Sequence, residues 1–427
     1  MLAIYPALDC HHPCPQCGIA MPATGFMLAA GRSLGTAECK SCRRRYLFDL
    51  PVGFGILYPF CLDRDSGEAS GPERGAWFRD RLIQAWKGRE RDKAVALNIE
   101  VLAAKRQLVL CNCLDDVYGH VLFKLFGCAR YLGQDRDVGV AVLIPENVRH
   151  LVPDGVAEVW TVSAPLKALT RWNTELHHKL SMAIAAKDRA WLGWCYPCPN
   201  PTVDISLFAR SSPRPELPSG RPLVVFCSRG DRTWGRSRRA QARNLKKLST
   251  LLRDRYAGAV LVVTGCEPSD QAVVGCLDDR NPKPDEKQER RWIDVWASAD
   301  LAIGVHGSNM LLPTALAKGA IVLLPEDKYL HMLQDCLPGP GCGSPRADLC
   351  LLRTIYGDGS LANVDPRTVA GLAISMLDER DRFLALEKAA FLFADRGADQ
   401  TAIIQEIQAL ARFRKQPGAA GVAGGQE

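Results

Sequence analysis

The sequence predicts an α/β protein with parallel, doubly wound sheets, and three observations support this. Short apolar runs that fit buried strands alternate with stretches of helical spacing through most of the chain. This alternation occurs in two series, separated by the proline- and serine-rich segment Trp194–Ser219. The pattern is clearest between Ser298 and Asp327. We therefore expect two Rossmann-like domains joined by a linker.

Residues 298–327 predict a strand, a glycine-containing turn, a helix and a second strand. In order these are Leu301–Val305, His306–Asn309, Met310–Lys318 and Ala320–Leu324. Two buried strands joined by so short a helix are most simply parallel neighbours. Ligands of such sheets bind beyond the carboxyl ends of the strands, where a turn into a helix suits a phosphate. The candidate binding residues at that edge are His306, Gly307, Ser308, Asn309 and Glu326. The alternative is an ordinary loop with a capping Ser or Asn and a satisfied His.

Composition limits the class of protein. The chain has 427 residues, enough for two or three domains, with the 47% hydrophobic and 24% charged residues of an ordinary globular protein. A net charge of +7 favours anionic partners such as a nucleotide, a nucleic acid or an acidic glycan. No apolar run reaches membrane-spanning length, and Met1–Cys10 lacks the features of a signal peptide. The odd number of cysteines, 17, argues against a disulfide framework, so we expect a reducing, cytoplasmic environment.

Four of the cysteines form two C-x2-C pairs near the N-terminus. They are Cys14, Cys17, Cys39 and Cys42. Paired thiolates at this spacing predict a zinc ribbon with a structural, four-coordinate zinc that supports the fold rather than chemistry. Cys10, His11 and His12 lie close enough to compete as ligands, and unrelated free cysteines are the alternative. Cys195 and Cys198 form a further C-x2-C without a matching pair, which we interpret as packing in the linker.

The organisation predicted from these patterns has six segments. They are a zinc ribbon (1–50), a connector with helices (51–104), an N-terminal Rossmann-like domain (105–195), a linker (196–220), a C-terminal Rossmann-like domain (221–412) and a disordered tail (413–427). The expected strands are Gly53–Tyr58, Leu108–Cys113, Val138–Ile144, Val156–Val162, Leu223–Cys227, Ala259–Thr264 and Leu349–Ile355. The other expected helices are Ala76–Trp86, Asp92–Ala104, Val121–Tyr131, Pro165–Lys187, Arg238–Tyr256, Asp285–Ala299, Pro366–Leu377 and Asp381–Leu410.

Two arginines follow the first strand of the second series. Arg229 and Arg232 lie after Leu223–Cys227, at the sheet edge that also carries the His306 turn. A guanidinium is always charged and offers a planar fork to two phosphate oxygens. We therefore expect the two arginines to hold a pyrophosphate that the turn meets from the other side. The alternative is a structural arginine that pairs with Asp231 or Asp300.

Residues Leu223–Tyr329 resemble the donor-binding domain of glycosyltransferases with the GT-B architecture, most closely the glycosyltransferase family 61 type. The family's arginine loop, its His-Gly turn and its acidic residue after a strand correspond to FCSRGDR, DLAIGVHGSNML and AIVLLPED. Ser308 stands where the family more often has Ala, and Asn309 stands a few places earlier than the usual Asn. The zinc ribbon is an addition to the family pattern.

The resemblance implies an inverting, metal-independent hexosyl- or pentosyltransferase. It would move a sugar from a nucleotide-sugar donor in the C-terminal domain to a glycan or other hydroxyl acceptor held by the N-terminal one. A D-x-D acidic pair beside a sheet edge is not evident, since Asp63 and Asp65 fall in the connector. One alternative is a zinc-ribbon nucleic-acid-binding protein, which the lack of a recognised motif disfavours. A catalytically silent glycan-binding relative is another.

Inverting transfer needs a general base for the acceptor hydroxyl. The GT-B layout implies that the base comes from the N-terminal domain, where Asp115, Asp116 and His120 follow the first buried strand. Asp116 would act as a desolvated carboxylate, and His120 would act through an imidazole, a group whose unperturbed pKa lies near neutrality. The alternative is that one of the two acids caps the next helix. His306 is a further catalytic candidate, because its imidazole would meet the leaving phosphate.

Overall fold

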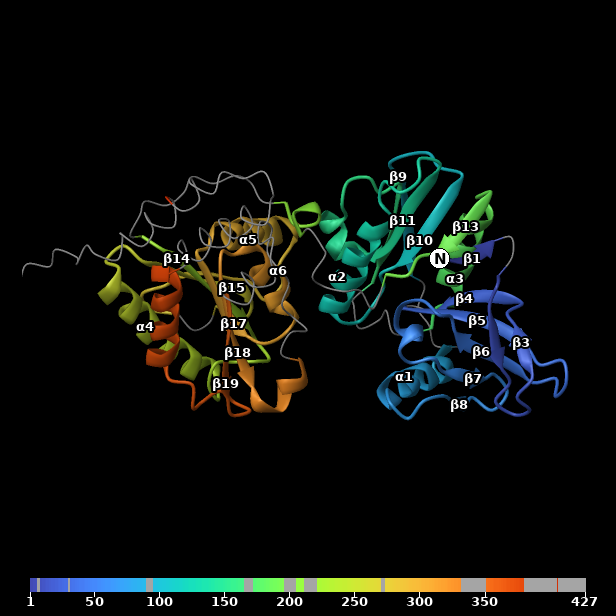
Figure 1. Ribbon diagram of the computed structural model, residues 1–427, viewed down its shortest axis with the longest axis horizontal. Coiled ribbons are helices and arrows are strands. Elements are labelled where there is room, and N and C mark those ends of the chain that lie inside the picture. Colours follow the sequence, from blue (N-terminus) through green and yellow to red (C-terminus); the bar gives the residue numbers. More distant parts are fainter. Residues whose placement is uncertain are drawn as a thin grey trace, which may run out of the picture. The chain divides into compact units, whose positions relative to one another are not determined.

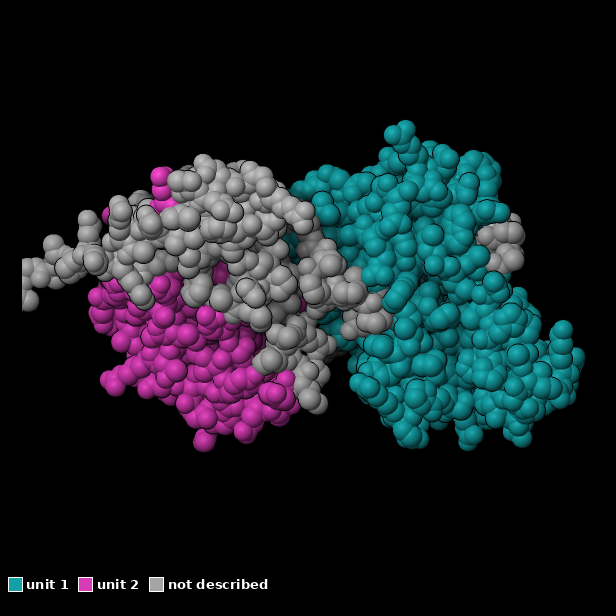
Figure 2. Space-filling view, viewed as in Figure 1, with its two compact units in different colours: residues 1–211, 284–291 teal, residues 212–283, 292–427 magenta. Residues whose placement is uncertain are grey.

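The computed structural model describes residues 1–5, 8–29, 31–89, 95–164, 172–195, 205–210, 221–269, 273–331, 351–379 and 405. The chain forms two compact units: residues 1–211 with 284–291, and residues 212–283 with 292–427 (Figure 2). Most of the predicted linker, Cys198, the helix predicted at Asp381–Leu410 and the C-terminal tail lie outside the described residues. Within the described residues, no helix has both the length and the apolar character that a membrane span requires.

The second unit is built on a six-stranded, wholly parallel sheet. Its spatial order is β16-β15-β14-β17-β18-β19. The strands are β14 (Leu223–Arg229), β15 (Val260–Cys266), β16 (Leu277–Arg280), β17 (Leu301–Val305), β18 (Ala320–Pro325) and β19 (Leu352–Gly357). Numbered along the chain, this order is 3-2-1-4-5-6, the doubly wound order of dinucleotide-binding sheets. The predicted parallel pairing of Leu301–Val305 with Ala320–Leu324 is confirmed.

Helices pack on both faces of this sheet (Figure 1). They are α4 (Arg238–Arg255), α5 (Glu286–Ser298), α6 (Leu311–Leu316) and a helix over residues 366–379. The buried stripe of α4, including Leu245 and Leu252, and residues of the 366–379 helix share one core with Phe226 of β14. On α5, the buried Trp296 donates its indole N–H to Thr264 Oγ1 of β15 at 3.1 Å.

The first unit contains a second six-stranded sheet, in the order β1-β13-β10-β11-β12-β9. Its strands are β1 (Leu2–Tyr5), β9 (Ala96–Val101), β10 (Gln107–Asn112), β11 (Val138–Pro145), β12 (Glu158–Ser163) and β13 (Arg189–Leu192). The four inner strands are parallel, and β1 and β9 join the edges antiparallel. The main helices are α2 (Tyr118–Gly127), continued by a 3₁₀ turn over Cys128–Tyr131, and α3 (Thr174–Ala185). A parallel α/β sheet is therefore present in each unit, as predicted.

The N-terminal residues form an antiparallel layer of the same unit. A five-stranded sheet runs β4 (Gly25–Ala29), β5 (Arg32–Glu38), β6 (Arg45–Asp49), β7 (Cys61–Asp63) and β8 (Ala69–Ser70), beside a β2–β3 hairpin (His11–Pro13 and Ala20–Pro22). Alternate residues of β6 enter two cores. Tyr46 and Phe48 join the core of the α/β sheet, whereas Leu47 joins the core beneath α1 (Ala76–Lys87). The predicted boundaries at residues 50 and 104 stay predictions, although this sheet continues to Ser70.

Two local predictions were wrong. Residues of the helix predicted at Asp92–Ala104 form β9, because Ala96–Val101 completes the backbone hydrogen bonds of β12 along an otherwise open edge. The strand predicted at Gly53–Tyr58 is a 3₁₀ helix over Gly53–Ile56. Its Phe54 carbonyl accepts from the backbone N–H groups of Leu57 and Tyr58 at 3.0 and 2.9 Å, which satisfies the segment locally.

Candidate functional site

The two predicted arginines and the His306 turn meet at the carboxyl edge of the second unit's sheet. Strand β14 pairs with β15 on one side and with β17 on the other, so the order of the sheet changes direction between β14 and β17. Arg229 is the last residue of β14, Arg232 lies in the loop that follows, and the turn after β17 begins at His306. Arg232 Nη1 donates to the His306 carbonyl oxygen at 2.9 Å. The structure thus brings together residues that lie more than 70 positions apart.

Gly307 lies at the centre of this arrangement. A Cβ atom on Gly307 would lie 2.7 Å from Arg229 Nη1, 2.9 Å from Asn309 Oδ1 and 3.0 Å from Arg232 Nη1. Its φ of +147° is also in the region that favours glycine. Two guanidinium groups and an amide therefore converge on bare backbone. The two guanidinium groups suit an anion that approaches the main chain closely, whereas Asn309 presents its amide oxygen, which only accepts hydrogen bonds.

The other predicted binding residues of this edge, Ser308, Asn309 and Glu326, have separate environments. Ser308 starts a 3₁₀ turn, Ser308–Met310, before the six-residue α6, so the helix is shorter than the predicted Met310–Lys318. Its dipole contributes correspondingly little, and the arginines supply most of the positive charge. Asn309 Nδ2 donates to the Cys227 carbonyl at 3.3 Å, which ties the turn to β14. Glu326 is exposed in the turn after β18.

The structural alternative holds in part for Arg229. Its Nε and Nη2 donate to the two carboxylate oxygens of Asp231 at 2.5 and 3.0 Å. The Asp231 side chain is 63% exposed, and an ion pair with so exposed a partner contributes little to stability. Asp300 instead accepts from Lys318 and from the backbone N–H of Leu223. Asp231 therefore competes only weakly with an anionic ligand for Arg229.

A buried polar network supports the arginine loop, and no local sequence pattern indicates it. Glu267, just after β15, is fully buried and pairs with Arg280 Nη1 at 3.2 Å. Gln241 Nε2 of α4 donates to the same Glu267 oxygen at 3.1 Å, and the Ser228 hydroxyl donates to it as well. Ser228 directly precedes Arg229. No motif marks these residues, because four separate elements contribute them.

In the first unit, the predicted acids after β10 have separate environments. Asp115 Oδ2 lies 2.9 Å from Lys124 Nζ, and Asp115 Oδ1 lies 3.1 Å from His120 Nδ1. Burial opposes ionisation of Asp115, but the charge of Lys124 and the hydrogen bond with His120 hold its pKa well below the usual range. Asp115 Oδ1 also accepts from the backbone N–H of Val117 at 3.1 Å. Val117 is the N-cap of α2 and makes no side-chain cap, so neither acid is the N-cap residue.

Asp116 differs from its neighbour in burial and partner. Its Oδ1 accepts from Arg81 Nη1 of α1 at 2.9 Å. Burial raises the pKa of Asp116, and the adjacent Asp115 raises it further. Asp116 and His120 both line a pocket whose other walls include Trp77 and Phe78 of α1 and Phe54. The structure thus places two of the predicted candidates at one aromatic-lined pocket within the first unit.

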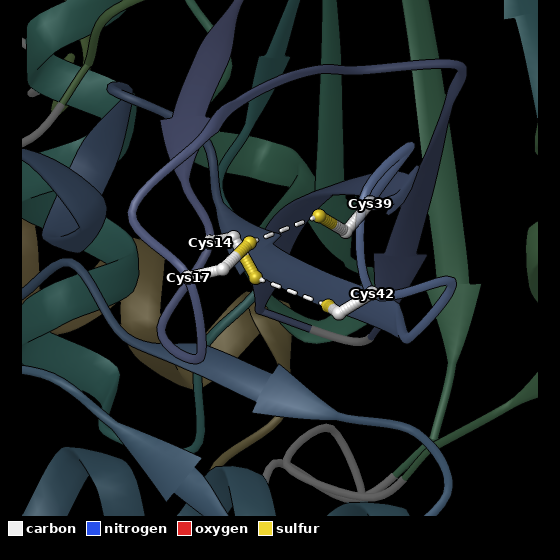
Figure 3. Close-up of side chains that lie close together, drawn as sticks. All are labelled: Cys14, Cys17, Cys39 and Cys42. Atoms are coloured by element: carbon white, nitrogen blue, oxygen red, sulfur yellow. Dashed lines mark hydrogen bonds between the residues drawn. The ribbon is translucent and has the colours of Figure 1, made fainter.

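The four N-terminal cysteines converge as a zinc ligand set would (Figure 3). The sulfurs of Cys14 and Cys42 are 3.6 Å apart, those of Cys17 and Cys39 are 3.5 Å apart, and all four lie within 4.8 Å of one another. These spacings fit four thiolates around one tetrahedral ion with Zn–S bonds of about 2.3 Å. Among the described residues, Cys10, His11 and His12 do not join this group.

The surroundings favour the thiolate form of Cys14. Burial opposes its ionisation, but hydrogen bonds with the Tyr46 hydroxyl and with the backbone of Cys17 lower the pKa of the Cys14 thiol to about 6. The Cys14 sulfur lies 3.6 Å from Tyr46 Oη. A thiolate is the form that binds a metal ion. Tyr46 is therefore a further contributor to the site that the cysteine spacing alone did not indicate.

Comparisons with known proteins give structural neighbours only. No family model and no curated protein matches the chain. The structure is similar to E. coli ADP-heptose LPS heptosyltransferase II, with 16% identity, 66% of this chain and 99% of that one covered, and a TM-score of 0.37. It is also similar to an E. coli heptosyltransferase with ADP, with 14% identity, 63% and 99% covered, and a TM-score of 0.40. At these TM-scores the likeness supports no conclusion about this chain.

The cysteine site leads to a first prediction. We expect one zinc ion bound by Cys14, Cys17, Cys39 and Cys42, and its loss to destabilise the first unit as a whole, because Cys14 and Cys39 belong to the core of the α/β sheet. The Cys14→Ser/Cys39→Ser variant should lose one zinc in elemental analysis and melt at lower temperature. If this variant keeps the zinc content of the wild type, the zinc ion is not bound by these four cysteines.

The buried Asp115–Lys124 pair leads to a second prediction. Their side chains are 9% and 2% exposed, so Asp115→Asn leaves a buried ammonium without its counter-charge. Breaking such a pair costs ~3–5 kcal/mol, measurable by urea denaturation. The matched control is Asp188→Asn, which should change the stability little because Asp188 pairs with Arg106 on the surface. If the two variants lose the same free energy of unfolding, burial of Lys124 is not the reason for the cost.

Proposed function

We propose that this chain is a glycosyltransferase that uses a nucleotide-sugar donor and a hydroxyl acceptor. The observation that carries the proposal is the convergence of Arg229 and Arg232 on the bare backbone of Gly307. This cradle lies at the point where a 3-2-1-4-5-6 sheet changes direction, which is where doubly wound sheets bind nucleotides. The resemblance of the same stretch to family 61 donor domains supports a sugar nucleotide over other phosphates.

The donor's diphosphate is the group that the cradle recognises. Two guanidinium groups offer charge-assisted hydrogen bonds to phosphate oxygens, and Gly307 lets those oxygens approach the backbone. As the sugar leaves, negative charge grows on the β-phosphate, and preorganised arginines stabilise that charge. His306 would lie beside the same oxygens. Fixed positive charge of this kind is the basis on which we propose metal-independent transfer.

The acceptor is proposed to bind at the pocket of the first unit. Its aromatic wall, Trp77 with Phe54 and Phe78, offers apolar surface, and Asp116, Arg81 and His120 supply the polar groups. Asp116 takes the proton of the acceptor hydroxyl as the new bond forms, which gives inversion at the anomeric carbon. The raised pKa of Asp116 makes it a stronger base than an ordinary aspartate. His120, hydrogen-bonded to Asp115, is the second candidate for the base.

Nucleotide binding tests the donor site. A thermal-shift screen with UDP, GDP, ADP, CMP and dTDP should raise the melting temperature with one of them, because a ligand of the native state stabilises it by mass action. Arg232→Ala should then weaken binding of that nucleotide by ~1.5–3 kcal/mol in calorimetric titration. His306→Ala should act similarly, and Gly307→Ala should abolish binding because its Cβ fills the cradle.

The matched control is Lys246→Ala, a cation exposed on α4 of the same unit. It should leave the nucleotide affinity unchanged, which separates a local effect from one of net charge. If Arg232→Ala and Gly307→Ala both bind the nucleotide like the wild type, the donor site is not at this edge.

Kinetics test the acceptor base. Asp116→Asn should lower kcat by ~10²–10⁴ with donor affinity kept. Because the pKa of Asp116 is raised, its base form is lost as the pH falls through a value above that of an ordinary aspartate. The acid limb of kcat/KM in the wild type should therefore lie above the usual aspartate range and vanish in Asp116→Asn. Normal turnover in Asp116→Asn, with the loss found instead in His120→Gln, would transfer the role to His120.

A further inference from the structure

A second group of thiols lies in the interior of the first unit. Cys111 stands near the end of β10, Cys128 at the end of α2 and Cys195 after β13, and all three are buried. Their sulfur atoms lie within 4.8 Å of one another. A fourth buried cysteine, Cys113, places its sulfur 3.5 Å from that of Cys128. Four cysteines from three separate elements thus share one small region.

This region is the point where the first unit's sheet changes direction. Numbered along the chain, its parallel strands β10 to β13 stand in the order 4-1-2-3, so β10 has β11 on one side and β13 on the other. In the second unit the corresponding position holds the arginine cradle. Here sulfur atoms occupy the crevice. Gly193 leaves room for them, since a Cβ on it would lie 2.7 Å from the Cys111 sulfur.

The geometry fits a single metal ion. Three atoms within 4.8 Å of one another always enclose a point at most about 2.8 Å from each of them (4.8 Å divided by √3), near the Zn–S bond length of about 2.3 Å. The four sulfurs of the N-terminal site lie within the same limit of 4.8 Å. A cluster of several irons needs more room than this. An all-thiolate set selects a soft or borderline ion such as zinc.

The surroundings of the three sulfurs include a buried ion pair and a cavity. Three thiolates around Zn²⁺ carry a net charge of only −1. Lys124 is fully buried on α2, one helical turn before Cys128, and its ammonium is paired with Asp115 at 2.9 Å. Cys195 and Lys124 line a common cavity with Asn112 and Gly193. This cavity reaches Cys195, one of the three ligands.

We propose that Cys111, Cys128 and Cys195 bind a second, structural zinc ion. The ion joins the end of β10, the end of α2 and the segment after β13. It therefore fixes both ends of the segment that carries Asp115, Asp116 and His120. Its role is to hold this segment in place, because all three ligands are buried core side chains.

Elemental analysis of the full chain, purified under reducing conditions, tests the proposal. The wild type should hold two zinc ions per chain. The Cys14→Ser/Cys39→Ser variant should keep one, and Cys128→Ala should also keep one while melting at lower temperature than the wild type. The matched control is Cys227→Ala, which removes a buried thiol of the second unit that belongs to no such group among the residues that the structure describes, and it should keep two zinc ions.

Several results would overturn the proposal. One is a Cys128→Ala variant with the zinc content of the wild type. Another is a Cys14→Ser/Cys39→Ser variant that folds without any zinc. If Cys128→Ala does not fold, the zinc content of the wild type decides. One zinc ion per wild-type chain, and none in the Cys14→Ser/Cys39→Ser variant, would exclude a second site. A Cys113–Cys128 disulfide in peptide mass spectrometry of the reduced-purified chain, with one zinc per chain, would likewise exclude it.

Discussion

The parallel pairing of β14 with β17 is the constraint on which the candidate donor site depends. Successive strands of the second unit are laid down on one side of β14 and then on the other, so the connections after β14 and β17 depart from each other and leave a crevice. The register Cys227–Gly304 sets the arginine loop opposite the His306 turn. The Arg232–His306 hydrogen bond then joins the two loops. Each loop alone holds only part of the candidate binding residues.

Desolvation is the second force that shapes the molecule. Glu267 and Arg280 in the second unit, and Asp115 and Lys124 in the first, are charged groups removed from water, and each pair is retained in direct contact. Burying either member alone would cost several kcal/mol, as is general for uncompensated charge. Both pairs lie beside loops that carry candidate functional residues. Fixed loops of this kind keep ligand-binding groups in place before the ligand arrives.

The two adjacent acids after β10 show how burial separates chemically identical groups. Asp115 is held ionised by Lys124 and His120, whereas the pKa of Asp116 is raised by burial and by the charge of its neighbour. A pair of titratable groups whose environments push their pKa values apart is a common arrangement at catalytic sites. The sequence presents two aspartates, and only their surroundings distinguish a structural carboxylate from a candidate base.

The sequence by itself determined the alternation of strands and helices, the parallel neighbours Leu301–Val305 and Ala320–Leu324, and the four-cysteine group, because these follow from local periodicity and short spacing. Tertiary structure alone decided the rest. Residues 96–101 became a strand because an open sheet edge required a partner. The network at Glu267 and the thiol group at Cys128 each join residues from distant elements. Contacts of that range are fixed by the order of strands in the sheet, which no single stretch of sequence encodes.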